Sequence, residues 1–266
     1  MKASNLYITG ASGFIGKNLI KSLKKKNIFH YCVSRKKTEF DNTIELKNYK
    51  DLEPKKNSIL IHLAENNNIS EVDLLGKNYI NNNVNTLKLL LKKNWKHAVY
   101  ISSVMVEQNL NKGLIYKKSK KACEKIILEY GGTILRMTNL YGPYMSDVNI
   151  FSDIIKQLNN QSITLKNPNA IRDFLWIDDA VEAIISAIKK TPGGIYNIAS
   201  GKLISVEEIV KHFLKIHSNG IKNIISTQKN ENDYFSAIDI EKTKLDLNWK
   251  PNFTIQTGIK KLLKND

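Results

Sequence analysis

The chain has 266 residues, of which 42% are hydrophobic and 25% are charged, and this length suits one sizeable core or a core with a smaller lobe. No apolar run reaches membrane-spanning length, no signal-peptide pattern is present, and the two cysteines form no disulfide framework. We therefore expect a cytoplasmic protein without membrane insertion. The five histidines show no metal-ligand spacing, so the sequence predicts no metal site.

The formal net charge is +16, which raises nucleic-acid binding as one class of function. The positive charges are spread along the chain and nearly all belong to lysines, a pattern typical of a solvated surface, so we expect no nucleic-acid partner. Only three arginines occur, Arg35, Arg136 and Arg172. Because the planar guanidinium suits phosphate better than an ammonium does, each arginine is a candidate phosphate contact.

The segment TGASGFIG, residues 9–16, lies between a short apolar run and an amphipathic stretch, which predicts a strand, a glycine turn and a helix. Gly10 allows the sharp turn, Gly13 lets a pyrophosphate approach the backbone, and Gly16 lets the helix pack on the strand. The free amides at the start of the helix favour an anion. The candidate cofactor-binding residues of this segment are Gly10, Ser12, Gly13, Phe14 and Ile15.

Residues 29–33 are aromatic and β-branched and predict a second strand, which ends in Ser34, Arg35 and Lys36. A dinucleotide-binding unit meets the adenosine ribose at about this distance from the glycine turn. A fold that prefers NAD places an acid there, whereas cations attract the 2′-phosphate of NADP. We therefore assign Ser34, Arg35 and Lys36 to the cofactor site and predict NADP as the preferred cofactor, with NAD as the alternative.

Strand and helix patterns then alternate along the chain without hairpin signals, which indicates a parallel α/β sheet of the doubly wound, Rossmann type. The predicted strands are residues 43–46, 58–63, 98–101 and 133–137. The predicted helices are residues 74–93 and 116–130. The polar loop at residues 65–68 follows a buried strand, at the edge where such sheets bind ligands.

Ser103 ends a predicted strand, and Tyr116 and Lys120 follow on a predicted helix, one turn apart on the same face. A nearby ammonium stabilises phenolate and lowers the pKa of a tyrosine, which predicts Tyr116 as a general acid or base. The Ser103 hydroxyl is placed to hold a carbonyl or alcohol oxygen of a substrate. These three residues are the candidate catalytic group.

At this point the chain resembles the extended short-chain dehydrogenase/reductase family, in its sugar-nucleotide epimerase/dehydratase group. Nine segments match in order over nearly the whole chain, so the resemblance is specific. They are TGASGFIG at 9–16, IHLAE at 61–65, N-V-x-T at 83–86, ISSVMVE at 101–107, YKKSK at 116–120, LRMTNLYGP at 135–143, RDFLWIDD at 172–179, YNIASG at 196–201, and LNWKP at 247–251 with Gly258.

The resemblance implies that Ser103 polarises the substrate, Tyr116 transfers a proton, and Lys120 holds the cofactor ribose while lowering the pKa of Tyr116. It adds Leu63, Ala64 and Asn83 to the cofactor site, together with Tyr116 and Lys120. It also places Asn139 and Arg172 in the substrate site, beside the catalytic Ser103, where these two residues contact the diphosphate of a nucleotide sugar. It also implies a homodimer. We expect residues 1–143 with 173–199 to form the cofactor domain, and residues 144–172 with 200–266 to form the smaller C-terminal α/β lobe that binds the sugar nucleotide.

The chain departs from the family pattern at several places. Glu65 stands where the family has alanine, and we expect this charge to face solvent, with a catalytic role as the alternative. The acid that usually follows the third strand is replaced by Lys47 or Asn48, and the segment from Ser103 to Tyr116 is about a dozen residues shorter than usual. The C-terminal element at residues 229–233 lacks its arginine. Arg136 suits a structural ion pair and support of the site equally well.

The residues also select among reactions. Dehydratases of the group have Asp-Glu directly after the serine or threonine, and here Val104 and Met105 stand there and cannot move a proton. We predict NADPH-dependent reduction of a nucleotide-linked 4-keto sugar, often a 6-deoxy sugar, for surface-glycan precursors. A sugar-nucleotide 4-epimerase is the alternative, and a non-catalytic nucleotide- or RNA-binding Rossmann protein comes third. The nucleotide, the sugar and the face of C4 that is attacked stay open.

Overall fold

The computed structural model describes residues 5–66, 68–109, 113–217, 222–228 and 234–264. Its centre is a seven-stranded sheet with the strand order β10-β6-β5-β4-β1-β2-β3, in which every pair of neighbours is parallel. The strands are β1 (Leu6–Thr9), β2 (His30–Ser34), β3 (Thr43–Glu45), β4 (Ile59–His62), β5 (His97–Ser103), β6 (Thr133–Met137) and β10 (Gly194–Ile198). The predicted doubly wound α/β fold is confirmed.

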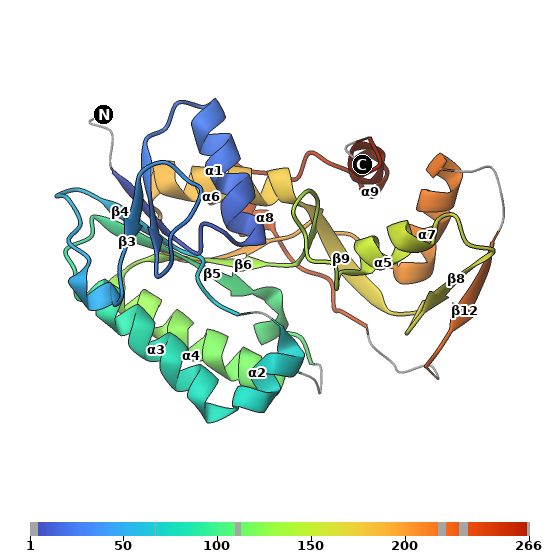
Figure 1. Cartoon of the computed structure of the whole chain (residues 1–266), viewed down its shortest axis with the longest axis horizontal. Helices are drawn as coiled ribbons and strands as arrows, with labels where there is room; N and C mark the ends of the chain where they lie inside the picture. The colour runs from blue at the N-terminus through green and yellow to red at the C-terminus, as the bar shows by residue number, and fades with distance from the viewer. Residues whose placement is uncertain (1–4, 67, 110–112, 218–221, 229–233, 265–266) are drawn as a thin grey trace.

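Helices cover both faces of this sheet (Figure 1). On one face lie α1 (Phe14–Lys25) and α6 (Ile177–Lys190), with α8 (Glu241–Leu247) next to α6. On the other face α3 (Lys77–Leu91) and α4 (Leu114–Tyr130) pack side by side, with the short helix α2 (Ile69–Leu75) at their end. Because both faces are covered, the strands are continuous apolar runs such as ILI at 59–61.

The single helix predicted over residues 74–93 is wrong, because the structure has two helices there. The chain breaks between α2 and α3 at Gly76, whose φ of +52° is a backbone conformation that side-chain-bearing residues rarely adopt. The apolar periodicity of the two helices runs on across the glycine, so the pattern alone did not show the break.

The rest of the chain forms a smaller lobe at the right of Figure 1. Its three-stranded sheet has the order β11-β9-β7, with β9 antiparallel to β11 and parallel to β7, and a second sheet pairs β8 with β12. These strands are β7 (Asn139–Tyr141), β8 (Ser162–Leu165), β9 (Ile171–Trp176), β11 (Leu203–Ser205) and β12 (Asn223–Ser226). Its helices are α5 (Ile150–Gln157), α7 (Val206–His217) and α9 (Ile255–Leu262).

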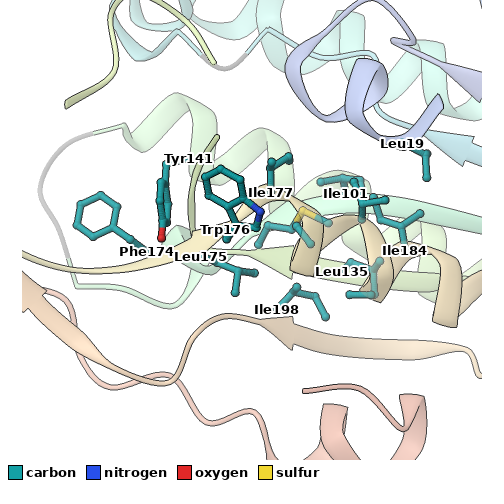
Figure 2. Close-up of a cluster of buried hydrophobic side chains, with 14 of the residues drawn as sticks. Leu19, Ile101, Leu135, Tyr141, Phe174, Leu175, Trp176, Ile177, Ile184 and Ile198 are labelled. Atoms are coloured by element: carbon teal, nitrogen blue, oxygen red, sulfur yellow. The ribbon is translucent and has the colours of Figure 1, made fainter. Parts of the chain in front are cut away.

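One hydrophobic core runs from the α1 and α6 side of the large sheet into the smaller lobe (Figure 2). Leu135 and Ile184 belong to the sheet end of this core, and Trp176 and Phe174 carry it along β9 into the lobe. The ring of Tyr141 stacks on that of Phe151 with centroids 4.1 Å apart. The two lobes therefore share one hydrophobic core. In the part of the chain that the structure describes, no helix is long and apolar enough to cross a membrane.

Candidate functional site

The glycine turn lies between the end of β1 and the start of α1. Gly10 has a φ of +73°, and a Cβ there would come within 2.7 Å of the Ala64 backbone nitrogen, while a Cβ on Gly16 would come within 2.3 Å of the Gly10 carbonyl oxygen. Gly13 caps α1 without a side-chain hydrogen bond to the helix amides. The turn therefore offers the uncapped amide end of a helix in a backbone cradle that side chains would fill, which fits a pyrophosphate.

The other predicted cofactor residues lie at the same carboxyl edge of the sheet. Ser12 is exposed within the turn, Phe14 and Ile15 begin α1, and Leu63 with Ala64 follows β4 against Gly10. At the end of β2, the Lys36 backbone amide donates to the Ser34 hydroxyl at 3.2 Å, and Arg35 and Lys36 are exposed. The predicted segments thus converge on one edge, because parallel strands all end there.

The structure also brings together the three candidate catalytic residues. Ser103 ends β5, and Tyr116 and Lys120 lie on α4 with 8% and 5% of their surfaces exposed. The Ser103 hydroxyl lies close enough to Tyr116 to lower the pKa of its hydroxyl, and the Lys120 Nζ lies 5.4 Å from the centroid of the Tyr116 ring. The Ser103 Oγ also accepts the Met105 backbone amide at 3.2 Å, which caps the short 3₁₀ helix η2 (Val104–Val106).

The direction of the Tyr116 pKa differs from the prediction. Burial raises this pKa, the Lys120 ammonium lowers it, the Glu65 carboxylate raises it and the hydrogen bond with Ser103 lowers it, and the net direction is upward. The predicted lowering by Lys120 is present but is outweighed, because desolvation penalises the phenolate and a carboxylate faces the ammonium. Tyr116 therefore holds its proton at neutral pH in this structure.

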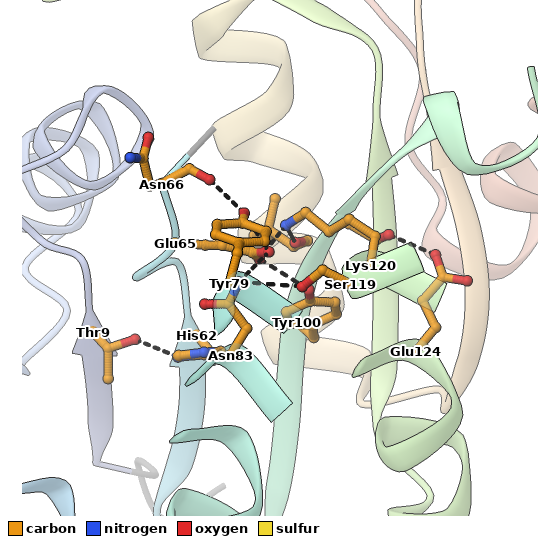
Figure 3. Close-up of polar contacts among 12 residues, drawn as sticks. Thr9, His62, Glu65, Asn66, Tyr79, Asn83, Tyr100, Ser119, Lys120 and Glu124 are labelled. Carbon is orange, nitrogen blue, oxygen red and sulfur yellow. Dashed lines mark hydrogen bonds and ion pairs between the residues drawn. The ribbon is translucent and has the colours of Figure 1, made fainter. Parts of the chain in front are cut away.

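Glu65 is the largest surprise at this edge, and the expectation that it faces solvent is wrong. Its side chain is only 7% exposed and points inward among donors from α3, β5 and α4 (Figure 3). Its Oε2 accepts from Lys120 Nζ at 2.5 Å and from the Tyr100 hydroxyl at 3.0 Å. Its Oε1 accepts from the Tyr79 hydroxyl at 2.9 Å and from Asn83 Nδ2 at 3.1 Å. Glu65, Tyr79, Asn83, Tyr100 and Lys120 are named the Glu65 cluster here.

Burial raises the pKa of the Glu65 carboxyl, but the Lys120 ammonium and the hydrogen bonds outweigh it, so the pKa lies below its ordinary value. Burial lowers and Glu65 raises the pKa of Lys120, with an upward net direction. The pair is therefore ionised. Sequence reasoning missed Tyr79 and Tyr100; the available signal was the spacing of Tyr79 and Asn83, one helical turn apart on the helix that faces this edge.

A second buried ion pair lies further along α4, and it decides the role of Arg136. The Arg136 guanidinium donates to both oxygens of Glu124, at 2.8 Å from Nε and 2.7 Å from Nη2, and it also pairs with Glu107. The Ser102 hydroxyl donates to the same Glu124 at 2.5 Å. Of the two readings of Arg136, the structure therefore shows the structural ion pair. Glu107, Glu124, Arg136 and Ser102 are named the Glu124 cluster here.

The predicted substrate residues lie on neighbouring strands, where β7 pairs with β9. Asn139 Nδ2 donates to the Asp173 carbonyl at 3.0 Å, and Arg172 donates to the Ile171 carbonyl at 2.8 Å while its guanidinium stacks 4.7 Å from the Phe235 ring. Their contact with a diphosphate stays a prediction. The C-terminal element at 229–233 lies outside the described residues. Among the described residues, no group of three or more His, Cys, Asp or Glu side chains could hold a metal ion.

These features define a dinucleotide-fold protein with a serine, tyrosine and lysine group beside its glycine turn. Residues 6–199 match the model of the NAD dependent epimerase/dehydratase family, and because this is most of the chain, the chain belongs to that family.

Known proteins are similar over nearly the full length. A putative UDP-glucose 4-epimerase of Methanocaldococcus jannaschii is 27% identical over 97% of both chains. CDP-abequose synthase of Salmonella typhimurium is 25% identical over 97% of this chain and 96% of its own. The solved structure of RMD from Pseudomonas aeruginosa complexed with NADPH has a TM-score of 0.80 at 19% identity over 98% of both chains, which shows the shared fold.

Proposed function

We propose that the chain reduces a nucleotide-linked 4-keto sugar, often a 6-deoxy sugar, with NADPH. The observation that carries this proposal is the Tyr116 hydroxyl, which is buried, keeps its proton and lies near Ser103 at the edge of the sheet that bears the glycine turn. A ketone that gains hydride becomes an alkoxide and needs a proton donor within reach. The family membership and the names of the similar proteins support a nucleotide-sugar substrate.

The chain's own residues account for the cofactor. NADPH, when bound, supplies the hydride. Gly10, Gly13 and the first amides of α1 would hold its pyrophosphate, and Leu63 with Ala64 would border it. The exposed cations Arg35 and Lys36, next to the Ser34 hydroxyl, support the preference for a 2′-phosphate.

The proton step follows from the positions of the side chains. The Ser103 hydroxyl would hold the sugar oxygen O4, and the Tyr116 hydroxyl would donate its proton to that oxygen as hydride reaches C4. Asn139 and Arg172 would hold the diphosphate from β7 and β9, with the charge-assisted guanidinium contact contributing most. Val104, the residue after Ser103, is 3% exposed and apolar, so no acid stands there to eliminate water.

A sugar-nucleotide 4-epimerase is the second candidate, favoured by the full-length similarity to a putative UDP-glucose 4-epimerase. The third reading, a non-catalytic protein that binds nucleotide or RNA, has the positive net charge in its favour. It does not explain why Ser103, Tyr116 and Lys120 converge on one edge of the sheet.

The test is a screen of UDP-, dTDP-, GDP- and CDP-linked 4-keto sugars with NADPH, followed by the loss of NADPH absorbance. We expect one of these sugar nucleotides to be reduced, with one NADPH oxidised for each molecule of product. We expect NADH to support a slower rate. Interconversion of two sugar nucleotides without net cofactor consumption would establish the 4-epimerase instead. Salt-sensitive RNA binding with no turnover of either kind would establish the non-catalytic reading.

Two further parts of the proposal concern organisation. All strands of the seven-stranded sheet fall within residues 1–143 and 173–199, which supports these ranges as the core of the cofactor domain. The proposed boundaries divide the structure less well elsewhere, because β7 and most of β9 fall in the same ranges but pair in the smaller lobe, and α8 packs on α6. We also propose a homodimer through the face of α3 and α4, where Leu114 and Leu128 are exposed, with sedimentation as its test. The cytoplasmic location stays a prediction.

A further inference from the structure

Glu65 is a carboxylate in a place that ordinarily excludes one. It follows the end of β4 beside the glycine turn, yet its side chain is 7% exposed. A buried carboxylate is strongly destabilising unless its oxygens are hydrogen-bonded and its charge is paired. The structure satisfies both conditions, with side chains drawn from three separate elements.

The donors around Glu65 nearly saturate its two oxygens. Oε2 accepts from Lys120 and Tyr100, and Oε1 accepts from Asn83 and from Tyr79, whose hydroxyl shares its proton with the Asn66 carbonyl. An ionised carboxylate offers about four acceptor positions and no donor. A protonated Glu65 would place a further donor opposite groups that themselves donate. The surroundings of Glu65 therefore favour the ionised carboxylate.

Glu65 in turn fixes the position of Lys120. The ammonium donates to Glu65 at 2.5 Å and to the Ile101 carbonyl at 2.8 Å, and it lies 4.9 Å from the centroid of the Tyr100 ring. Two of its three protons are therefore committed within the protein. The Lys120 ammonium that lies beside Tyr116 on α4 is therefore already paired with the Glu65 carboxylate.

We propose that Glu65 is a positioning residue of the active site, which fixes the Lys120 ammonium in an ion pair so that Tyr116 works beside a neutral pair and stays a proton donor. This inference rests on the proposed function and deepens it, because a protonated tyrosine serves reduction. It assigns a role to the one residue of IHLAE that departs from the family pattern.

The other titratable groups that face Glu65 leave Lys120 as its partner. Burial lowers the pKa of His62, on β4, to about 4 and raises that of Cys123, on α4, to about 11, so both are neutral at neutral pH. Burial and the nearby carboxylate raise the pKa of Tyr79 on α3 and of Tyr100 on β5. Among the described residues that face Glu65, Lys120 thus carries the compensating charge.

The test measures the protonation states of Tyr116 and Lys120 from their ¹³C chemical shifts as a function of pH. The full chain is labelled at tyrosine Cζ and lysine Cε, and Tyr116→Phe and Lys120→Met assign the two signals. In the wild type we expect neither Tyr116 nor Lys120 to titrate below the ordinary tyrosine value of 10.0. Glu65→Gln keeps the shape and removes the charge. In that variant the first proton to leave the Tyr116–Lys120 pair is expected about one pH unit lower, from whichever residue it leaves.

Glu129→Gln is the matched control, because it removes one carboxylate from the exposed face of α4, where Glu129 pairs with Lys125. Both titrations should stay where they are in this control. Titration of Tyr116 well below 10 in the wild type overturns the inference without any variant, even if Glu65→Gln does not fold. An unchanged first proton loss in a folded Glu65→Gln protein overturns it equally.

Kinetics separates this inference from the proposed function. For an active reductase, the apparent pKa of the basic limb of the kcat/KM profile should be about one pH unit lower in Glu65→Gln, as in the NMR titration. It should not change in Glu129→Gln. If the NMR titrations move but no 4-keto sugar is reduced, the pairing role holds and the proposed substrate is wrong. If reduction occurs and neither titration nor the pH profile moves, the function holds and the role of Glu65 is wrong.

Discussion

Helix α4 takes part in two buried ion clusters one helical turn apart, the Glu65 cluster through Lys120 and the Glu124 cluster through Glu124 itself. The two carboxylates are buried alike, with side chains 7% and 6% exposed, and each also accepts from at least one hydroxyl. The difference lies in the cation. Arg136 grips Glu124 with a planar fork, whereas Lys120 presents a compact ammonium next to a tyrosine.

That difference separates a structural pair from one suited to chemistry. Burial lowers and the paired carboxylates raise the pKa of Arg136, with a net rise, so this guanidinium stays charged over the whole working range. The Glu65 cluster contains Lys120, which contacts the ring of Tyr116, and that tyrosine can gain or lose a proton. Burial of charge by itself therefore does not mark a functional site. A buried charge marks a functional site when it lies beside a titratable side chain at the carboxyl edge of the sheet, where ligands bind.

The largest effect is expected from Tyr116→Phe, which removes the proton donor from the site while leaving both ion clusters intact. We expect kcat for the 4-keto sugar nucleotide to fall by about 10²- to 10⁴-fold, the usual contribution of a general acid. The free energy of unfolding should change by only about 1 kcal/mol, since the ring stays in place and one hydroxyl is removed. Steady-state kinetics and urea denaturation measure the two quantities, and a variant within about tenfold of wild-type kcat contradicts the assignment.

The opposite result is expected from Arg136→Met, which leaves the buried Glu124 carboxylate without its cation. The free energy of unfolding should fall by about 3 to 5 kcal/mol, because a buried charge loses its partner. Urea denaturation followed by circular dichroism measures this loss, with Arg136→Lys as a control that keeps the charge and loses the fork. The pH profile of kcat/KM should not move. If it moves as in Glu65→Gln, the two clusters are not separate in function.

His62, next to the Glu65 cluster, predicts a pH dependence of stability. Burial lowers its pKa to about 4 from 6.5, so between these values the unfolded chain binds the extra proton and stability is lost as the pH falls. From pH 7 to pH 5 this loss is about 2 kcal/mol. Urea denaturation at the two pH values measures it. His62→Gln should reduce the loss by about this amount and leave the smaller share of His97 and His212, whose pKa values burial also lowers. A loss in that variant equal to that of the wild type would show that His62 is not the titrating group.

The smallest effect is expected from Glu129→Gln, which breaks the exposed pair with Lys125 on the same helix. Its free energy of unfolding should change by no more than about 0.5 kcal/mol, because solvent screens an exposed pair at an N–O distance of 3.9 Å. The same urea denaturation tests it. If the free energy of unfolding fell as much as in Arg136→Met, burial would not decide how much an ion pair of α4 contributes to stability.

Much of the fold could be predicted from local patterns. Alternating strand and helix periodicities indicate a parallel sheet because each pattern is set by near neighbours along the chain, and the glycine turn was recognisable from its spacing. The break at Gly76 was missed, because a single glycine inside an apolar periodicity does not show its backbone angle. The antiparallel pairing of β11 with β9 in the smaller lobe also went unpredicted, because its strands are short and far apart in the chain.

The sequence by itself determined the candidates at the ligand edge: Ser103 at a strand end and Tyr116 one helical turn before Lys120. Helical spacing and strand order suffice for these, since they are local properties. Only the tertiary structure decided what Lys120 faces. Glu65 lies 55 residues before it, and whether a carboxylate meets water or an ammonium depends on how β4, α3 and α4 pack. The direction of the Tyr116 pKa followed the same packing, because desolvation and long-range charge act through space and not along the chain.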